Sequence, residues 1–314
     1  MKRSAQRNGA PSTGRRGAPQ GAARWAVILG ASSGTGAAIA RAVASDERLG
    51  LGVFGAHRGN HPEEAAAVER AVAAAGRPVH LRRADAGTFE GAEEGAVELL
   101  QVAGPRSVAL VVHSIANASV GLLASGEDDQ VRPRQAHKTF ESMAHSFVWW
   151  TQALLARDLL APGALLLGLS NPMVDQAVRG TALIAASKAA LEVYVRHLAR
   201  ELAPRGYRVN LLKFGAVVTD AMRKTFHGPA LDRLQSALLR AIPAGRLLTV
   251  DEVAQLVCFL ASSDAAFFNG ATIDFTGGET QSLLDALVFP AAAPRAPSAP
   301  TPRKPRKAPG ARRD

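Results

Sequence analysis

The stretch WAVILGASSGTG, Trp25 to Gly36, decides the fold that this sequence predicts. Its first part, Trp25–Leu29, is an apolar run of strand length, and the turn GASSGTG follows it and opens a helical pattern. Glycines let such a turn approach a pyrophosphate, whose charge then lies on free N–H groups at the helix start. The spacing Gly30, Gly34, Gly36 differs from the commoner dinucleotide fingerprint, and a plain strand-to-helix connection would also use glycines. Its place in the first strand–helix unit favours a dinucleotide cofactor.

The same alternation of strand and helix continues along the chain. Apolar runs of strand length lie at Trp25–Leu29, Leu51–Phe54, Val79–Leu81, Val108–Val112, Ala164–Leu169, Val209–Leu212 and Ala271–Phe275. Patterns of helical length lie at Gly36–Ser45, Pro62–Ala75, Glu90–Val102, Gln135–Leu160, Thr181–Leu202 and Val250–Ala261. Runs of continuous apolarity are typical of strands that are covered on both faces. The sequence therefore predicts one α/β domain, a doubly wound Rossmann fold with a parallel sheet of about seven strands.

The positive charge of the chain lies at its two ends. The net charge is +10, but residues 1–24 carry +6, residues 290–314 carry +6, and the residues between them sum to −2. Both ends are rich in Ala, Pro, Gly and Arg and lack apolar periodicity, so we expect disordered tails at 1–24 and 290–314 around a folded domain at 25–289. The first tail also resembles an organelle transit peptide, but the second has the same composition, which favours compositional bias.

Composition excludes several other classes of protein. No apolar run approaches the roughly 18 residues that span a bilayer, so we expect no membrane segment. The single cysteine, Cys258, excludes an intrachain disulfide, suits a cytoplasmic location and is expected to pack in the core. No zinc-ligand spacing, aromatic stacking set or recognition helix indicates sequence-specific binding of nucleic acid.

The end of the second predicted strand indicates which dinucleotide is bound. It reads GAHRGN, with His57 and Arg58 where an NAD-selective site usually places an acid for the ribose hydroxyls. A guanidinium there binds a 2′-phosphate, so NADP(H) is favoured over NAD(H). His57 and His61 also have an i, i+4 spacing, but Gly59 and Asn60 between them break a helix, and we expect no metal site.

Several motifs together resemble the short-chain dehydrogenase/reductase family, over residues 24 to 289. GASSGTG resembles its cofactor turn, RADAG its adenine contact, ASKAAL its active-site helix, YRVNLLKFGAVVTDAM the strand and loop that hold the nicotinamide carboxamide, and FFNGATIDFTGGET its last strand. The resemblance, with Arg58, implies a cofactor site at Gly30, Ser32, Ser33, Gly34, Thr35, Gly36, Arg58, Asp85, Ala86, Ser114, Ile115, Ala116, Lys188, Gly215, Val217 and Thr219. It also implies a homotetramer.

Within that family the motifs are most similar to those of enoyl-acyl carrier protein reductases. VVHSIANAS at Val111–Ser119 resembles the end of their fourth strand, and ESMAHSFVWW resembles the helix that follows, without the asparagine of many carbonyl-reducing members. Those enoyl reductases carry one tyrosine after the serine of the fifth strand and a second one seven residues before the lysine. Here Asn171 and Thr181 occupy these positions, and Ile184 lies four residues before Lys188.

The missing tyrosine restricts the chemistry that we expect. Ketone reduction leaves an alkoxide that must take a proton from a matched acid, and threonine is too weak for that role. In the reduction of an enoyl thioester, the oxygen is an enolate only in passing and needs hydrogen-bond donors. Thr181, Ser170 and the ribose hydroxyl that Lys188 holds are the predicted donors, which makes Lys188, Thr181 and Ser170 the predicted catalytic residues.

The sequence thus predicts an NADPH-dependent reductase of enoyl thioesters in fatty acid or polyketide metabolism. Two alternatives stay open: another small-molecule oxidoreductase of the family, or a catalytically silent NADP-binding scaffold or sensor. The tails could also form a nucleic-acid interaction module. The predicted substrate cover, Thr219–Arg246, carries Arg223, Lys224, Arg233 and Arg240, so an acyl carrier protein or a coenzyme A phosphate is an expected partner.

Overall fold

The computed structural model describes residues 23–281 and shows one α/β domain on a single parallel sheet. Its seven strands have the order β3-β2-β1-β4-β5-β6-β7, and each neighbouring pair is parallel. They are β1 (Trp25–Leu29), β2 (Gly52–His57), β3 (Val79–Arg83), β4 (Val108–His113), β5 (Leu160–Ser170), β6 (Arg208–Phe214) and β7 (Thr272–Phe275). The predicted fold class and all seven predicted strands are confirmed. The predicted tails, apart from residues 23 and 24, and residues 282–289 of the predicted domain lie outside the described residues.

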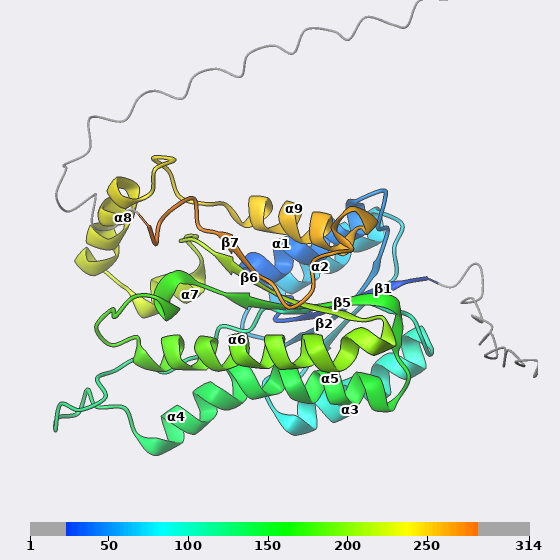
Figure 1. Cartoon of the computed structure of the whole chain (residues 1–314), viewed down its shortest axis with the longest axis horizontal. Coiled ribbons are helices and arrows are strands. Elements are labelled where there is room, and N and C mark those ends of the chain that lie inside the picture. Colours follow the sequence, from blue (N-terminus) through cyan, green and yellow to red (C-terminus); the bar gives the residue numbers. More distant parts are fainter. Residues whose placement is uncertain (1–22, 282–314) are drawn as a thin grey trace, which may run out of the picture.

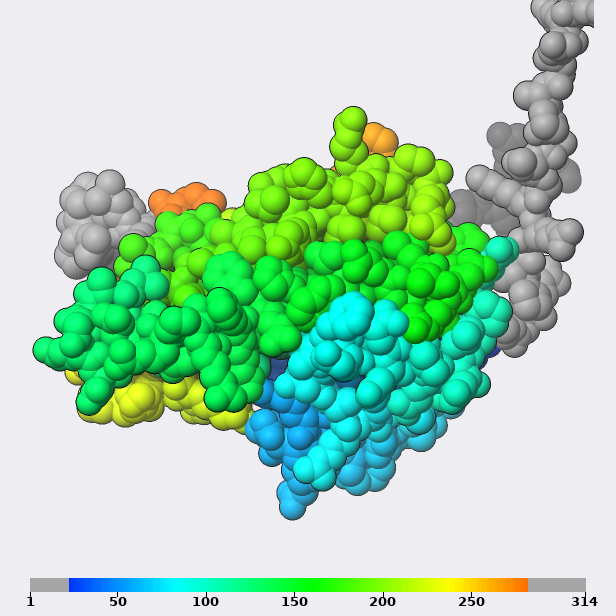
Figure 2. Space-filling model, turned by 90° about the horizontal axis from the view of Figure 1, so that it is seen from below, coloured from blue at the N-terminus to red at the C-terminus, as the bar shows by residue number. Residues whose placement is uncertain are grey.

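Helices cover both faces of the sheet (Figure 1). They are α1 (Gly34–Ser45), α2 (Pro62–Ala74), α3 (Phe89–Ala103), α4 (Pro133–Phe140), α5 (Ser146–Ala156), α6 (Ala182–Leu202), α7 (Asp220–Thr225), α8 (Pro229–Ala241) and α9 (Val250–Ala261). On one face lie α1, α2 and α9, and on the other lie α3, α5 and α6. Figure 2 shows this second face, with the cyan of α3 beside the green of α5 and the yellow-green of α6.

The sheet separates two apolar cores, and its inner strands are buried on both faces, whereas the edge strands β3 and β7 are partly exposed. Phe54, Trp150 and Leu166 belong to the core under α3, α5 and α6, whereas Ile28 and Val257 belong to the core under α1, α2 and α9. Successive residues of a strand point to opposite faces, so a strand buried on both faces is apolar throughout. The continuous apolar runs of the sequence have this cause.

The order of the strands reverses between β1 and β4. The chain builds β1, β2 and β3 outward on one side, then returns to pair β4 with β1 and continues outward on the other side. Loops from the two halves separate at this switch point, and in sheets of this kind ligands bind in the crevice at the carboxyl ends of the strands.

The predicted helix Gln135–Leu160 exists as a helical path from Pro133 to Ala156 that contains one irregular turn, but its predicted end is wrong because Leu160 begins β5. A π-helical turn, η1 (Glu141–His145), separates α4 from α5, and α5 ends at Ala156. The hydroxyls of Ser142 and Ser146 donate to the carbonyls four residues earlier, each at 2.8 Å. The same kind of bond joins Thr151 to the carbonyl of Phe147 at 2.7 Å inside the regular helix α5, so these bonds do not by themselves explain the π turn. The chain then leaves α5 through Asp158, whose φ is 50°, and enters β5 at Leu160.

Two short helices, α7 and α8, lie where the sequence predicts only a substrate cover. They follow β6 and lie at the same end of the sheet as the carboxyl ends of the strands (Figure 1). None of the helices within residues 23–281 is long and apolar enough to cross a membrane.

Candidate cofactor-binding and active site

A cavity of about 470 Å³ opens at the carboxyl ends of the strands, at the switch point. Its walls include the loops after β1 to β6, the first half of α6, and parts of α7 and α8. Among the predicted site residues, those that line it are Gly30, Ser32, Ser33, Gly34, Thr35, Arg58, Asp85, Ala86, Ser114, Ile115, Ala116, Ser170, Lys188, Gly215, Val217 and Thr219. The structure thus brings together every predicted residue except Gly36 and Thr181.

The glycine-rich turn forms the phosphate end of the cavity. Gly30 has φ 92°, and a Cβ there would lie 2.6 Å from the carbonyl oxygen of Ser114. A Cβ on Gly36 would lie 2.0 Å from the carbonyl oxygen of Gly30, so this glycine lets α1 approach the strand rather than contacting a ligand. Because α1 begins at Gly34, its free backbone N–H groups lie beside the cavity and suit a pyrophosphate.

The ends of β2 and β3 form a second part of the cavity. Arg58 is exposed there, and His57 lies beside it, half-buried, with a pKa that burial lowers. One oxygen of Asp85 accepts the N–H of Gly87 at 2.9 Å, and Trp150 donates from Nε1 to the carbonyl of Ala86 at 2.9 Å. These bonds hold the turn after β3 in a fixed position against the core.

Lys188 and Ser170 lie together at the other end of the cavity. Lys188 is 4% exposed, and its Nζ donates to the carbonyl oxygens of Leu169 at 2.7 Å and Ile115 at 3.4 Å. Burial lowers the pKa of Lys188 to about 8, so the ammonium form predominates at neutral pH. Ser170 follows Leu169 in the chain, and its Oγ is buried and has no hydrogen-bond partner within residues 23–281. Because Lys188 and Ser170 both line the cavity, the Ser170 hydroxyl is a candidate donor to an oxygen of a ligand.

Thr181 is not part of this group. Its side chain is buried, its hydroxyl donates to the carbonyl of Val178 at 2.8 Å, and it borders a separate groove instead of the main cavity. Thr181 is the residue that precedes α6, and this bond closes the last turn before the helix. The expectation that it supplies an oxyanion donor therefore lacks geometric support. Ile184, one turn further on, does line the cavity and presents an apolar side chain beside Lys188.

Neither tyrosine of the chain reaches the cavity. Tyr194 lies on the outer side of α6, where its hydroxyl is 3.0 Å from Nδ1 of His145. Tyr207 precedes β6 and packs against the core. Neither residue lines the cavity, and the expectation that neither substitutes for the missing acid stays a prediction. Cys258 is buried in α9, where burial raises its pKa to about 11, which agrees with the predicted core position.

His113 lies behind Lys188 and is fully buried. Its Nε2 is 2.8 Å from the Oγ of Ser146, which itself donates to the carbonyl of Ser142, so Nε2 is the ring nitrogen that carries the proton. Burial and the nearby Lys188 lower the pKa of His113 to about 3. The imidazole is therefore neutral at physiological pH and adds no charge to the site.

The sequence did not reveal the apolar wall of the cavity or one of its acids. The wall is formed by Val120, Met143, Met173, Val178, Ile184, Met222, Phe226, Leu234 and Leu238. Most of these residues lie in loops and short helices, where no period indicates which side faces a ligand. Glu279, in TGGET, also lines the cavity; the available signal was its position just after the last strand, where the carboxyl ends of the strands meet.

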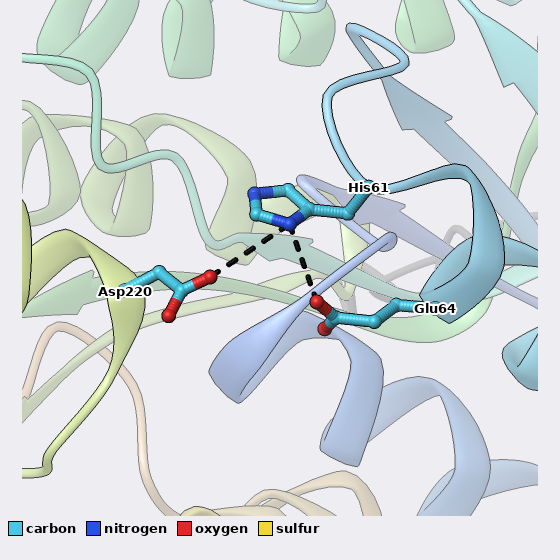
Figure 3. A group of neighbouring side chains, drawn as sticks. All are labelled: His61, Glu64 and Asp220. Carbon is cyan, nitrogen blue, oxygen red and sulfur yellow. Dashed lines mark ion pairs between the residues drawn. The ribbon is translucent and has the colours of Figure 1, made fainter.

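A contact between side chains links α7 to the start of α2 at the mouth of the cavity (Figure 3). Nδ1 of His61 lies 3.2 Å from a carboxylate oxygen of Glu64 and 3.7 Å from one of Asp220. These three ligand atoms lie within 4.8 Å of one another, which is compatible with a metal ion, although the two carboxylates are exposed and their pairing with His61 accounts for the arrangement. The absence of a metal site stays a prediction.

The chain is similar to known oxidoreductases over nearly all of the described residues. The family described as Enoyl-(Acyl carrier protein) reductase matches residues 30–280. An uncharacterised oxidoreductase of Methylorubrum extorquens is 32% identical over 255 residues, which cover 81% of this chain and 96% of that protein. The 3-oxoacyl-(acyl-carrier-protein) reductase FabG of Escherichia coli is 27% identical over 259 residues (81% and 96%), and the 1-cyclohexenylcarbonyl-CoA reductase of Streptomyces collinus is 29% identical over 255 residues (80% and 85%).

Solved structures show the same fold. A short-chain dehydrogenase of Burkholderia cenocepacia in complex with NADP superposes with a TM-score of 0.68 at 25% identity, covering 82% of this chain and 97% of that one. Together with the glycine turn at the start of α1 and the buried lysine on α6, these similarities identify the cavity as a site for a nicotinamide cofactor. The chain therefore belongs to the short-chain dehydrogenase/reductase family of oxidoreductases.

Proposed function

We propose that this protein uses NADPH to reduce the carbon–carbon double bond of an enoyl thioester. The observation that carries the proposal is the composition of the site around Lys188. No tyrosine lines the cavity, and Ile184 lies beside Lys188. Lys188 donates to the carbonyl of Leu169, and the next residue, Ser170, has a hydroxyl without a partner. The site thus offers hydrogen-bond donors for an oxygen but no phenol to protonate one.

This set of groups is better suited to an enoyl thioester than to a ketone. When bound, the reduced nicotinamide supplies a hydride to the β-carbon of the substrate. The hydroxyl of Ser170 and the ammonium of Lys188 stabilise the negative charge that develops on the thioester oxygen. Because this oxygen ends as a carbonyl again, it needs no net proton, and the α-carbon takes its proton from water. A ketone would leave an alkoxide beside Ile184, without an acid of matched pKa.

The apolar wall of the cavity is consistent with an acyl chain. It includes Met143 from η1, Ile184 from α6, Met222 from α7 and Leu238 from α8. Flexible methionine side chains adapt to chains of different shape and length. Two relatives have names that refer to thioester substrates, one carried by a protein and one by coenzyme A.

The outer surface of α7 and α8 favours an acidic carrier. Arg223, Lys224, Arg233 and Arg240 are exposed on these helices, Lys224 also lines the cavity, and within residues 23–281 none of the four forms an ion pair. Such a surface attracts an acyl carrier protein or the phosphates of coenzyme A and accelerates their association.

The direct test is oxidation of NADPH, followed at 340 nm, with crotonyl-CoA, a longer enoyl-CoA and the matching enoyl thioester of an acyl carrier protein. A 3-oxoacyl-CoA of equal length is the comparison substrate. We expect turnover with the enoyl compounds and little with the 3-oxoacyl compound. A clear preference for the 3-oxoacyl substrate would assign the protein to ketone reduction. No turnover of either, with the cofactor bound, would overturn the proposal.

A second candidate function is an NADP-binding scaffold or sensor without turnover. The hydroxyl of Thr181 is occupied by the carbonyl of Val178, so the site holds one donor fewer than the sequence predicts. This candidate predicts that NADP(H) raises the thermal unfolding temperature while no thioester is reduced. Measurable reduction that the variant Lys188→Met loses would exclude it.

The predicted homotetramer stays a proposal. The outer side of α5 and α6 presents Trp149 and Tyr194 on either side of His145, with ring centroids 5.9 Å away in each case, and Val193 is 40% exposed. Partly exposed aromatic side chains are typical of the surfaces through which subunits pair. Light scattering of the full chain distinguishes a tetramer from a monomer.

A further inference from the structure

Glu279 is a buried acid that the mechanism above does not use. The chain leaves β7 and turns back through Gly277 and Gly278, whose φ values are 66° and 85°, and this turn directs Glu279 toward the cavity. The side chain is only 6% exposed. Carboxyl groups are seldom buried to this degree without hydrogen-bond partners, because leaving water is costly for them.

One oxygen of Glu279 holds the loop after β6. Its Oε2 accepts the N–H of Ala216 at 3.0 Å, and a Cβ added to Gly215 would lie 3.1 Å from the same oxygen. Gly215 is also tied to β7, because its N–H donates to the carbonyl of Phe275 at 3.2 Å. The carboxyl group of Glu279 therefore lies directly against the Gly215–Ala216 peptide.

The other oxygen, Oε1, receives no hydrogen bond from residues 23–281. It is not fully buried, so a ligand can reach it. Since Glu279 lines the cavity, this oxygen faces a space where a ligand can donate to it. Burial and the nearby Asp274 raise the pKa of Glu279, and the hydrogen bond from Ala216 opposes them.

The layout of the cavity indicates which part of the cofactor lies at this end. A pyrophosphate suits the start of α1 in the middle of the sheet, and Arg58 and Asp85 lie beyond it at the ends of β2 and β3. The nicotinamide half must therefore extend the opposite way, past β4 and β5 to the loop after β6. Its carboxamide carries an amino group with two N–H donors. Such a donor is what Oε1 of Glu279 needs, because Oε1 accepts no hydrogen bond from residues 23–281.

We propose that Glu279 accepts a hydrogen bond from the carboxamide amino group of the nicotinamide and, through Ala216, fixes the loop against which the ring lies. This proposal rests on the nicotinamide cofactor of the proposed function and is independent of the substrate. In this arrangement one carboxyl group binds the cofactor with one oxygen and the protein backbone with the other.

The test compares two dinucleotides that differ in this amino group alone. Affinities of the full chain for NADP+ and for its 3-acetylpyridine analogue, in which a methyl group replaces the amino group, are measured by titration calorimetry. The quantity compared is the affinity for NADP+ divided by the affinity for the analogue. We expect this ratio to be about 10-fold higher in the wild-type protein than in the variant Glu279→Leu, because one hydrogen bond to a charged group has about this effect. Glu279→Gln, which keeps the shape and one acceptor oxygen, should give an intermediate ratio and covers the case in which the leucine variant does not fold.

The matched control is Asp274→Asn, which alters an exposed carboxyl group near Glu279 that does not line the cavity. Its ratio of affinities should equal that of the wild-type protein. The proposal is overturned if the ratio is the same in the wild-type, Glu279→Leu and Glu279→Gln proteins, because Glu279 then only supports the loop. Failure of enoyl reduction would leave this measurement unaffected, so the two proposals are separable.

Discussion

Lys188 donates from Nζ to the carbonyl oxygen of Leu169 at 2.7 Å, and so joins the middle of the active-site helix to the end of β5. The bond places a buried ammonium next to Ser170, the residue whose hydroxyl lacks a partner. Lys188 is only 4% exposed, and burying a charged group is costly. Burial therefore lowers the pKa of Lys188 to about 8. This relationship is the basis of the first two predictions.

Replacing Lys188 with methionine should abolish most of the turnover while stabilising the fold near neutral pH. In the folded protein the pKa is about 8, below the ordinary value of 10.5, so unfolding takes up a proton between these two values. The contribution of Lys188 to the free energy of unfolding is therefore unfavourable below pH 8 and improves as the pH rises toward 10.5. Urea unfolding of both proteins at pH 7, 8, 9 and 10 measures it, and a difference between them that does not change with pH would contradict the prediction.

Replacing Ser170 with alanine should lower turnover of an enoyl thioester about 100-fold, the usual effect of losing one oxyanion donor, and leave the affinity for NADPH unchanged. The matched control is Thr181→Val. Because the Thr181 hydroxyl donates to Val178, that variant should keep its turnover and lose about 1 kcal/mol of stability. Equal losses of turnover in the two variants would show that Thr181 acts on the substrate after all.

Arg58→Ala should weaken binding of NADPH about 10-fold and leave binding of NADH nearly unchanged. The guanidinium is exposed at the end of β2 and lines the cavity, where it can form a charge-assisted bond to a 2′-phosphate. Arg83→Ala removes a similar exposed arginine at the end of β3 that does not line the cavity, and should change neither affinity. The measurement is a fluorescence titration with each dinucleotide, and equal weakening of both would refute a role in selectivity.

The protein should lose stability in acid, partly because of His113. Its folded pKa is about 3 and its ordinary value is 6.5, so the unfolded chain binds a proton that the folded protein excludes. The contribution of His113 is fully present above pH 6.5 and is lost as the pH falls toward 3. His113→Gln, which retains a donor toward Ser146, should show a flatter fall of the unfolding temperature between pH 6.5 and 4.5. Parallel pH profiles of the two proteins would exclude the effect.

Asp220→Asn should speed the release of NADPH severalfold. Asp220 lies at the start of α7 and faces His61 at the start of α2 at a distance of 3.7 Å, so the pair joins two elements across the mouth of the cavity. This contact is an ion pair only while His61 is protonated, and a partly exposed ion pair is worth about 1 kcal/mol or less, which limits the change to roughly fivefold. Glu64→Gln serves as the control, because Glu64 pairs with His61 from within α2. Stopped-flow displacement gives the rates, and similar release from both variants would mean that the contact does not restrain α7.

Much of the fold could be predicted from local pattern. The inner strands were predictable because a strand covered on both faces is apolar along its whole length, as in Trp25–Leu29, whereas the edge strands β3 and β7 are only partly buried. The glycine turn and the end of β2 could also be predicted to lie in one site, because the carboxyl ends of parallel strands meet at the same edge of the sheet. The π-helical turn between α4 and α5 was not predictable, since apolar periodicity does not distinguish such a turn from the regular helix around it.

By itself the sequence determined the parallel sheet and the phosphate turn, because these follow from local apolarity and from glycine, while the resemblance of its motifs to the short-chain dehydrogenase/reductase family implied that Lys188 and Ser170 belong to one site. Only the tertiary structure decided that the hydroxyl of Thr181 is bonded to Val178, that Glu279 lies in the cavity, and that Asp220 meets His61. The physical reason is that spacing along the chain specifies which element carries a side chain, whereas the partner of a hydroxyl or carboxylate depends on which other elements pack beside it.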